Sequence, residues 1–254
     1  MEWTWFLKLD DTKYVIGQHP HGIFALGQIA WMFTSYKNPL YRRFPFLRNK
    51  VHSTGASIIY FIPFVRELFM IFGHIDVSRS ALKRTLNKGS SVGIVVGGEA
   101  EVLLARNDED TVVLKERKGF VKLALQNGAD LLPTYCFHNT NVFHINTSLL
   151  RGFRKWLQKN FKCSIPVCWG WRGTPLPHPV PLCLAIGDPI KVPKPSPGQE
   201  ITDKMVDEYH KKYIEALTKL FEECKAAAGY PEDRMLNVVD AHYVHPECIK
   251  AKLL

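Results

Sequence analysis

The residues Val92–Val96 form an unbroken apolar run that ends at Gly97 and Gly98. A strand this apolar is typical of a parallel sheet covered on both faces, because a strand with one exposed face would alternate apolar and polar residues. Tyr14–Gln18 is a short apolar run before it, and Leu131–Phe137 is another expected strand after it. The pattern therefore restricts the chain to an α/β architecture in which helices flank a mostly parallel sheet.

Helical segments alternate with the strands along the chain, and neither an internal repeat nor a long linker interrupts them. We therefore expect one domain over residues 1–254, with a charged loop directly after Gly98. The expected strands are Tyr14–Gln18, Lys50–Thr54, Ile75–Val77, Val92–Val96, Leu131–Phe137, Val167–Trp171 and Cys183–Ile186, and the expected helices are Ile23–Phe33, Ser78–Asn87, Phe120–Gln126 and Val206–Cys224.

Positive charge is concentrated near the N-terminus. The chain carries 33 basic and 24 acidic residues, a net charge of +9, and Trp31–Phe72 alone holds six basic residues against one acidic residue. The same stretch contains 11 of the 30 aromatic residues. Charge and aromatic content of this kind suit either nucleic acid or anionic lipid. We expect no nucleic-acid partner, because Ile58–Phe72 is too apolar for a solvated base-binding face.

The segment Ile58–Phe72 is interrupted by Pro63, Arg66 and Glu67 and is shorter than the roughly 20 residues that a membrane span needs. It is therefore expected to lie on a membrane surface rather than to cross the bilayer. Its membrane-facing or acyl-facing residues are expected to be Ile59, Phe61, Phe64 and Phe69.

Two histidines follow the first strand, in the sequence His19-Pro20-His21-Gly22. Catalytic groups of α/β proteins often lie where a strand meets a helix, and histidine suits proton transfer because its free pKa is near neutrality. Glu101 follows the strand Val92–Val96 and should reach the same edge of the sheet. A carboxylate there could fix the tautomer of a nearby imidazole and stabilise its charged form.

These motifs also have other interpretations. The His-x-His pair could bind a metal, as in metal-dependent hydrolases, with His138, His144 and Asp188 as further ligands. The eight-strand barrel that such a site implies does not fit this number of elements, so no metal is expected. Gly89–Gly93 matches the nucleophile-elbow pattern G-x-S-x-G but leads from a helix into a strand, the reverse of an elbow.

A basic cluster surrounds Gly119 at the start of the third expected helix. Backbone NH groups at a helix start and nearby cationic side chains can together hold phosphate groups. The basic residues are Lys115, Arg117, Lys118 and Lys122.

Three sequence blocks occur in the order seen in the diacylglycerol acyltransferase 2 family, which includes monoacylglycerol and wax-ester acyltransferases. They are Tyr14–Gly22, Val95–Glu101 and Arg117–Ala124, with Gly128–Pro133 close behind. The chain resembles this family from about Tyr14 to Tyr230. The resemblance also implies a remote kinship with glycerolipid acyltransferases of the H-x4-D type, and therefore a fold like theirs.

This resemblance implies an enzyme that transfers a fatty acyl group from acyl-CoA to a lipid hydroxyl without a cofactor. Diacylglycerol is the expected neutral lipid acceptor, and monoacylglycerol and fatty alcohol are the alternatives. His21 would be the general base, Glu101 would orient it, and backbone NH groups near Gly22 would stabilise the oxyanion. His19 would shape the turn or contact substrate, and Arg117, Lys118 and Lys122 would bind the CoA phosphates. A non-catalytic lipid-binding protein is a further alternative.

The chain departs from the family pattern at several points. Family members usually carry one or two membrane spans before the first block, and we expect this chain to lack them. Either the sequence is incomplete at its N-terminus, or the chain is held by the Ile58–Phe72 surface and the aromatic start Trp3, Trp5 and Phe6. Phe137 is followed by His138 and Asn139, where the family has Gly followed by Glu or Gln. Phe24 stands where the H-x4-D comparison would place an aspartate, so Glu101 is expected to supply the carboxylate.

The family acts at the endoplasmic reticulum and on lipid droplets, which suggests where this chain works. The chain end Lys250–Leu254 fits a dilysine retrieval signal, which requires a cytosolic C-terminus. We therefore expect attachment to the cytosolic face of the endoplasmic reticulum membrane, with the lipid droplet as the alternative, and an Asn146 without glycan.

Overall fold

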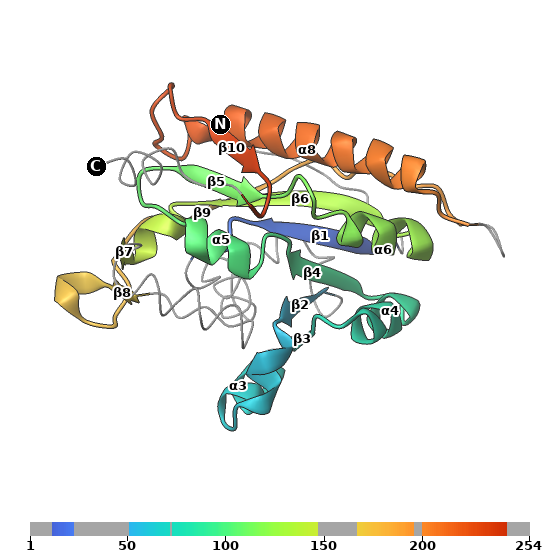
Figure 1. Ribbon diagram of the computed structural model, residues 1–254, viewed down its shortest axis with the longest axis horizontal. Helices are drawn as coiled ribbons and strands as arrows, with labels where there is room; N and C mark the ends of the chain where they lie inside the picture. The colour runs from blue at the N-terminus through green and yellow to red at the C-terminus, as the bar shows by residue number, and fades with distance from the viewer. Residues whose placement is uncertain (1–11, 23–50, 72, 147–166, 196–199, 243–254) are drawn as a thin grey trace.

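The central sheet has the strand order β3-β2-β4-β1-β6-β9 (Figure 1). It belongs to a computed structural model that describes residues 12–22, 51–71, 73–146, 167–195 and 200–242. The strands are β1 (Tyr14–His19), β2 (Val51–Gly55), β3 (Ile75–Asp76), β4 (Ser91–Val95), β6 (Asp130–Phe137) and β9 (Cys183–Ile186).

Strand β1 lies in the middle of the sheet, parallel to β4 on one side and β6 on the other. Gln18 is in register with Val95 of β4 and with Thr134 of β6, so the three strands end at one edge. Strand β9 is antiparallel to β6. The expectation of a mostly parallel α/β sheet is confirmed.

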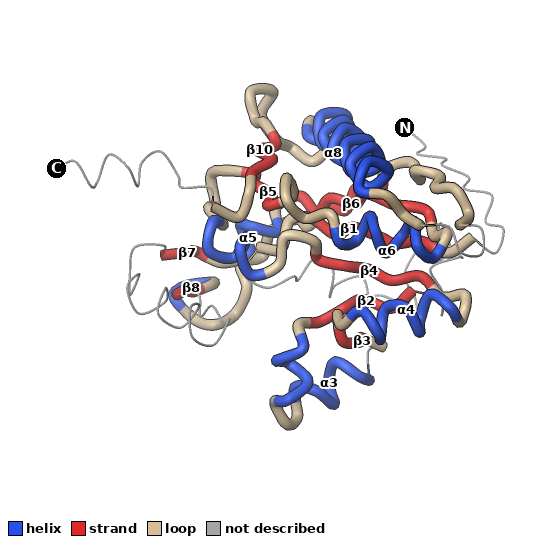
Figure 2. Tube along the Cα trace, turned by 45° about the vertical axis from the view of Figure 1, so that its right-hand side comes forward, coloured by secondary structure: helices blue, strands red, loops and turns tan. Residues whose placement is uncertain are grey.

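Three helices cover one face of this sheet: α4 (Arg79–Asn87), α6 (Gly119–Asn127) and α8 (Asp203–Lys225). Each helix contributes to one hydrophobic core with strand residues such as Val15. Examples are Leu86 of α4, Val121 of α6 and Leu217 of α8. Figure 2 shows α6 and α8 on the same side of the strands. Strand residues on the opposite face are buried too, as the apolar runs predicted, for example Ile16 and Leu132.

Local sequence signals explain where the two helices nearest the site begin and end. Helix α6 ends at Gly128, whose backbone is left-handed with φ 57°, a conformation that glycine adopts easily. Helix α8 begins after Thr202, whose hydroxyl accepts a hydrogen bond from the Met205 backbone NH. The helix expected over Val206–Cys224 is confirmed, and Val206 and Leu220 are among its buried residues.

Smaller elements project from the sheet or border it. After β2 come the short 3-10 helix η2 (Ser57–Phe61) and helix α3 (Val65–Ile71). After β6 come η3 (Asn139–Val142) and β7 (His144–Asn146), and β7 pairs with β8 (Val167–Trp169), which leads into η4 (Trp171–Gly173). Helix α5 (Glu99–Leu104) follows β4, and β5 (Asp110–Val113) pairs in parallel with β10 (Leu236–Val239).

The structure corrects two sequence expectations about these elements. Residues after Gly98 form α5 and β5 rather than a loop, because the acidic side chains Glu101 and Asp110 are buried there with polar partners. The strand expected over Val167–Trp171 ends at Trp169 and lies outside the central sheet. The helix expected over Ile23–Phe33 lies outside the described residues. Within those residues, no helix combines the length and apolar character that crossing a membrane requires.

Candidate active site

The two expected catalytic motifs leave the sheet side by side. The His19–Gly22 turn follows β1, Glu101 lies on α5 just after β4, and β1 and β4 are adjacent parallel strands. The sheet therefore brings the histidine turn and the acid to the same edge, as the sequence predicted. Carboxyl ends of parallel strands are where α/β proteins commonly bind ligands.

Glu101 is almost fully buried and bridges two segments of the backbone. One carboxylate oxygen accepts a hydrogen bond from the His21 backbone NH at 2.6 Å, and the other accepts one from the Val113 backbone NH at 2.8 Å. Gly97 makes room for it, because a Cβ there would lie 1.9 Å from the Glu101 carboxyl carbon. Burial raises the pKa of Glu101 to about 7, although the two hydrogen bonds and the nearby Arg117 charge oppose that rise.

The contact between Glu101 and His21 differs from the one expected. The sequence argument had the carboxylate orient the imidazole ring, whereas the carboxylate holds the backbone of the turn. The ring is oriented instead by its own neighbour, since His21 Nδ1 lies 3.0 Å from the Gly22 carbonyl oxygen. Glu101 therefore fixes the position of His21 through the main chain.

His21 is partly buried and held in a single tautomer. A carbonyl oxygen can only accept a hydrogen bond, so the contact with Gly22 requires a proton on Nδ1. Nε2 then carries the lone pair. Burial lowers the pKa of His21 below its usual 6.5, against the effect of its backbone hydrogen bonds. The ring is therefore neutral near pH 7 and can accept a proton at Nε2.

His19 lies deeper than His21. Its Nε2 lies 3.1 Å from the Tyr213 hydroxyl of α8, and burial lowers its pKa to about 3. Its Nδ1 is buried, with no hydrogen-bond partner in the described part of the chain. Gly17 admits the tyrosine, because a Cβ there would lie 1.8 Å from the Tyr213 hydroxyl. His19 thus connects the turn to α8.

Asn139 closes the turn from the side of β6. Its side-chain amide donates hydrogen bonds to the carbonyl oxygens of Pro20 at 3.0 Å and His21 at 3.1 Å. Gly22 has a φ of 61°, and a Cβ there would lie 2.7 Å from the Asn139 amide nitrogen. The departure at His138 and Asn139 was noticed in the sequence, but its role in holding the turn was missed.

The expected phosphate-binding residues are exposed but do not form one group. Lys118 pairs with Asp207 of α8 at 2.6 Å, and Lys122 pairs with Asp203 at 3.7 Å. Arg117 instead lies close enough to lower the pKa of Glu101.

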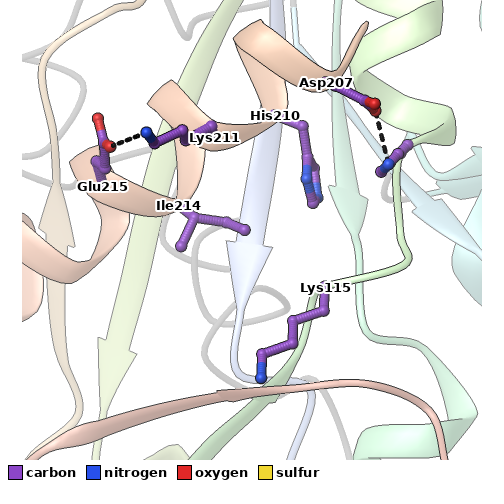
Figure 3. A pocket seen from close by; sticks show the side chains of 7 residues that line it. Lys115, Asp207, His210, Lys211, Ile214 and Glu215 are labelled. Atoms are coloured by element: carbon purple, nitrogen blue, oxygen red, sulfur yellow. Dashed lines mark ion pairs between the residues drawn. The ribbon is translucent and has the colours of Figure 1, made fainter. Parts of the chain in front are cut away.

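A cavity of about 520 Å³ lies between α8 and the segment that follows β5 (Figure 3). Lys115 borders one side, and residues of α8 border the other. Its lining comprises Lys115, Lys118, Asp207, His210, Lys211, Ile214 and Glu215. The predicted basic cluster thus contributes Lys115 and Lys118 to the cavity, and Lys211 is an addition that the sequence analysis missed.

The four residues expected to face lipid differ in their exposure. Phe61 is 79% exposed and Phe64 is 87% exposed. Ile59 and Phe69 are half-buried, and the Phe69 ring packs 4.7 Å from the His74 ring. Phe61 and Phe64 can therefore contact a lipid directly, whereas Phe69 packs against His74.

The residues named for a metal site have other partners. His19 Nε2 meets Tyr213, and His138 Nε2 meets the Ala228 carbonyl oxygen at 2.8 Å. Among the described residues, no three His, Cys, Asp or Glu side chains come together in the way a metal ion would require.

Comparison with known proteins places these motifs in a family. The family model described as diacylglycerol acyltransferase matches residues 7–239. Human diacylglycerol O-acyltransferase 2-like protein 6 is 39% identical over 89% of this chain and 70% of that protein. Diacylglycerol O-acyltransferase 2 of Mus musculus is 36% identical over 91% of this chain and 61% of that protein. Human 2-acylglycerol O-acyltransferase 3 is 35% identical over 90% of this chain and 69% of that protein.

The chain therefore spans between 61% and 70% of the length of these curated relatives. Among solved structures, the 1-acyl-sn-glycerophosphate acyltransferase PlsC from Thermotoga maritima aligns with a TM-score of 0.46 and 14% identity. That alignment covers 86% of this chain and 68% of the PlsC chain.

Proposed function

Because the chain belongs to the diacylglycerol acyltransferase family, we propose that it transfers a fatty acyl group from acyl-CoA to a lipid hydroxyl. Diacylglycerol is the proposed acceptor and triacylglycerol the product, in keeping with the names of most of the relatives compared. Monoacylglycerol is the second candidate acceptor, because a relative at 35% identity is named a 2-acylglycerol O-acyltransferase. Fatty alcohol, which would give a wax ester, is the third.

The observation that carries this proposal is the state of His21. Its Nδ1 proton is committed to the Gly22 carbonyl oxygen, and its pKa is lowered by burial. Nε2 is therefore an unprotonated base at neutral pH, on a turn held by Glu101 and Asn139. A general base needs this combination of fixed position and available lone pair.

In the proposed reaction, His21 Nε2 takes the proton from the acceptor hydroxyl as its oxygen attacks the thioester carbonyl. A C–O bond forms, and the carbonyl oxygen becomes an oxyanion. The His21 backbone NH is occupied by Glu101, so within the described part of the turn the Gly22 backbone NH is the candidate donor to that oxyanion. The C–S bond then breaks, and His21 returns its proton to the departing CoA sulfur.

The cavity between α8 and Lys115 is the proposed site for the CoA phosphates. Lys115, Lys118 and Lys211 contribute positive charge to its lining, and the ion pair of Lys118 with Asp207 would exchange for one with phosphate. Arg117 is proposed to act nearer Glu101, and Lys122 at the edge of the phosphate site. No metal or other cofactor takes part in this scheme.

We also propose that the chain works at a membrane, on the cytosolic face of the endoplasmic reticulum or on a lipid droplet. Phe61 and Phe64 protrude from η2 and the start of α3, where apolar side chains can enter a lipid surface. Ile59 and Phe69 would support that contact from below. This location suits an enzyme whose acceptor dissolves in lipid rather than in water.

The proposal is tested by incubating the purified chain with labelled acyl-CoA and, separately, diacylglycerol, monoacylglycerol and fatty alcohol. We expect the highest transfer rate with diacylglycerol. His21→Ala should lower that rate by about a hundredfold or more, the usual contribution of a general base. His242→Ala is the matched control, because His242 is an exposed histidine outside the His19–Gly22 turn.

One outcome would contradict this function, and another would contradict the proposed mechanism. Stoichiometric binding of lipid without any transfer would indicate a lipid-binding protein. Near-normal transfer by a folded His21→Ala variant would remove His21 from the mechanism. Thermal unfolding of each variant separates loss of activity from loss of structure.

A further inference from the structure

The order of the strands places two apolar projections on opposite sides of the catalytic turn. In the sheet, β2 lies beyond β4 on one side and β6 lies beyond β1 on the other. The η2–α3 segment follows the carboxyl end of β2, and the β7–β8 pair follows that of β6. Because these strands are parallel, both projections leave the edge that carries His19–Gly22 and Glu101 (Figure 1).

The first projection, η2–α3, exposes a continuous series of large apolar side chains. None of the residues in η2 or α3 is buried. Its only described side-chain ion pair is the one between the neighbours Arg66 and Glu67. The most exposed apolar residues are Phe61, Phe64, Met70 and Ile71.

The second projection is a loop over Trp169–Leu176, named here the tryptophan loop. Trp171 is 45% exposed and Leu176 is 58% exposed, and Trp169 is exposed beside them. The backbone NH of Trp171 donates to the Leu176 carbonyl oxygen, and that of Gly170 donates to the Thr174 carbonyl oxygen, both at 2.7 Å. The loop thus satisfies much of its backbone internally while directing apolar side chains outward, as contact with lipid requires.

We propose that the tryptophan loop and the η2–α3 projection bind the surface of an anionic phospholipid bilayer together, with the catalytic turn between them. This orientation rests on the proposed function in one respect, namely that the acceptor enters from the membrane. The inference assigns a membrane role to Trp169, Trp171 and Leu176, beyond the η2–α3 residues of the proposed function.

The chemistry of the tryptophan loop suits the bilayer interface. Tryptophan concentrates at that interface because its ring is apolar while its NH can remain hydrated. The guanidinium of Arg172 lies 4.7 Å from the centre of the Trp171 ring, so a cation accompanies the aromatic side chain where anionic headgroups would lie.

The charge of the chain favours a bilayer over a second copy of itself as the occupant. Two copies would each bring a net charge of +9 and would repel one another, whereas an anionic membrane attracts that charge. Two separate projections on either side of the His19–Gly22 turn can also be covered at once by an extended surface.

The test measures binding of the 254-residue chain to sedimented vesicles of phosphatidylcholine with about 30% phosphatidylserine, an anionic fraction chosen to attract basic proteins. One variant carries Trp169→Ser, Trp171→Ser and Leu176→Ser, and the other carries Phe61→Ser, Phe64→Ser and Ile71→Ser. Each should weaken binding by about tenfold or more, because exposed apolar area is lost. Met235→Ser is the control, because Met235 is 68% exposed but lies on neither projection.

A second measurement reports on the tryptophan loop without weakening its apolar character. Brominated phosphatidylcholine quenches tryptophan fluorescence only near the lipid chains. The vesicle-bound wild type should lose emission that a Trp169→Phe, Trp171→Phe variant does not, with both proteins equally bound. This comparison remains informative even if the serine variants fail to fold.

Three results would overturn the proposal. One is equal quenching in wild type and the phenylalanine variant. Another is undiminished vesicle binding by a folded tryptophan-loop serine variant. The third is a dimer, seen by sedimentation equilibrium, that either serine variant dissociates while vesicle binding stays unchanged. All binding is measured without acyl-CoA, so a chain that binds vesicles but transfers no acyl group contradicts the proposed function and not the membrane surface.

Discussion

At the residue scale, the two histidines of the His19–Gly22 turn differ because their ring nitrogens meet different partners. His21 donates from Nδ1 to a carbonyl oxygen and keeps a lone pair on Nε2. His19 meets a tyrosine hydroxyl with Nε2, and this hydroxyl has no other hydrogen-bond partner among the described residues. Since burial keeps both rings neutral near pH 7, His21 is suited to accept a proton and His19 to fix the turn.

Glu101→Gln should change how stability depends on pH. The pKa of Glu101 is about 7 in the folded chain and about 4.5 when exposed. Between these values the folded state keeps a proton that the unfolded state has lost, so stability falls as pH rises, by about 3 kcal/mol in total. The variant lacks this loss. Urea unfolding at about pH 5, 6, 7 and 8 measures the free energy of unfolding of both proteins.

The difference between the two proteins isolates Glu101, because His19 and His21 titrate in both. Glutamine should also lower stability at every pH by about 1–3 kcal/mol, since its NH2 group cannot accept from either backbone NH. A difference in stability that does not change with pH would show that the pKa of Glu101 is close to that of an exposed carboxyl.

Tyr213→Phe should allow the His19 ring to adopt either neutral tautomer. A buried hydroxyl without another acceptor donates to His19 Nε2, which places the imidazole proton on Nδ1. Nitrogen-15 NMR of the histidine rings should show this tautomer in the wild type and a mixture in the variant. We expect a loss of stability of about 1–3 kcal/mol, because a buried nitrogen loses its partner.

Tyr209→Phe, on the same helix but only half-buried, should leave both the tautomer and the stability unchanged. A proton on Nε2 in the wild type would contradict the assigned direction of the hydrogen bond.

The sequence predicted that the site residues follow neighbouring strands, but it did not predict which atoms meet. Parallel strands end at one edge, so His21 and Glu101 could be expected near each other from the sequence. Which atoms meet depends on how α5 packs, and that placed the carboxylate on the backbone of the turn. Tyr213 and Asn139 come from elements far along the chain, and no local pattern connects them to the turn.

At the element scale, buried charge explains why α5 and β5 were missed. Polar residues such as Glu101 and Asp110 made this stretch appear to be a solvated loop, yet both are buried because each has hydrogen-bond partners. Strands with mainly apolar sequences, such as β4 and β6, were found. The antiparallel direction of β9 depends on contacts distant in the sequence, which hydrophobic periodicity does not report.

Helices α6 and α8 together should determine the affinity for acyl-CoA. Lys118→Ala combined with Lys211→Ala removes two cations from the cavity lining. We expect the KM for acyl-CoA to rise by about tenfold, because charge-assisted hydrogen bonds to phosphate are lost. The KM for the lipid acceptor should change little, and initial rates at varied concentrations of each substrate measure both.

Lys219→Ala is the control for this pair, since Lys219 is exposed on α8 beside Glu223 and does not line the cavity. Equal increases in the KM values of both substrates would contradict a role for the cavity in binding CoA.

At the scale of the whole molecule, the segment after α8 connects the end of the described chain to the catalytic turn. Strand β10 pairs with β5, and Arg234 forms an ion pair with the buried Asp110 at 2.5 Å. Asp110 also accepts from the Tyr135 hydroxyl at 2.6 Å. The nearby Tyr230 hydroxyl accepts from the His138 backbone NH at 2.9 Å, next to Asn139, which holds the turn.

Replacing one partner of the Arg234–Asp110 ion pair should destabilise the chain more than replacing both partners. Arg234→Met leaves the Asp110 carboxylate buried without its cation, and we expect a loss of about 2–3 kcal/mol, less than for a fully buried pair because Arg234 is partly exposed. Asp110→Asn should cost a similar amount.

The double variant should be more stable than either single one, because no uncompensated charge remains, and urea unfolding of all four proteins measures the coupling. The transfer rate should fall in proportion to the population unfolded, since neither residue touches the catalytic histidines. Strictly additive losses would show that Arg234 and Asp110 stabilise the molecule independently, and the C-terminal segment would then be held by the β5–β10 pairing alone.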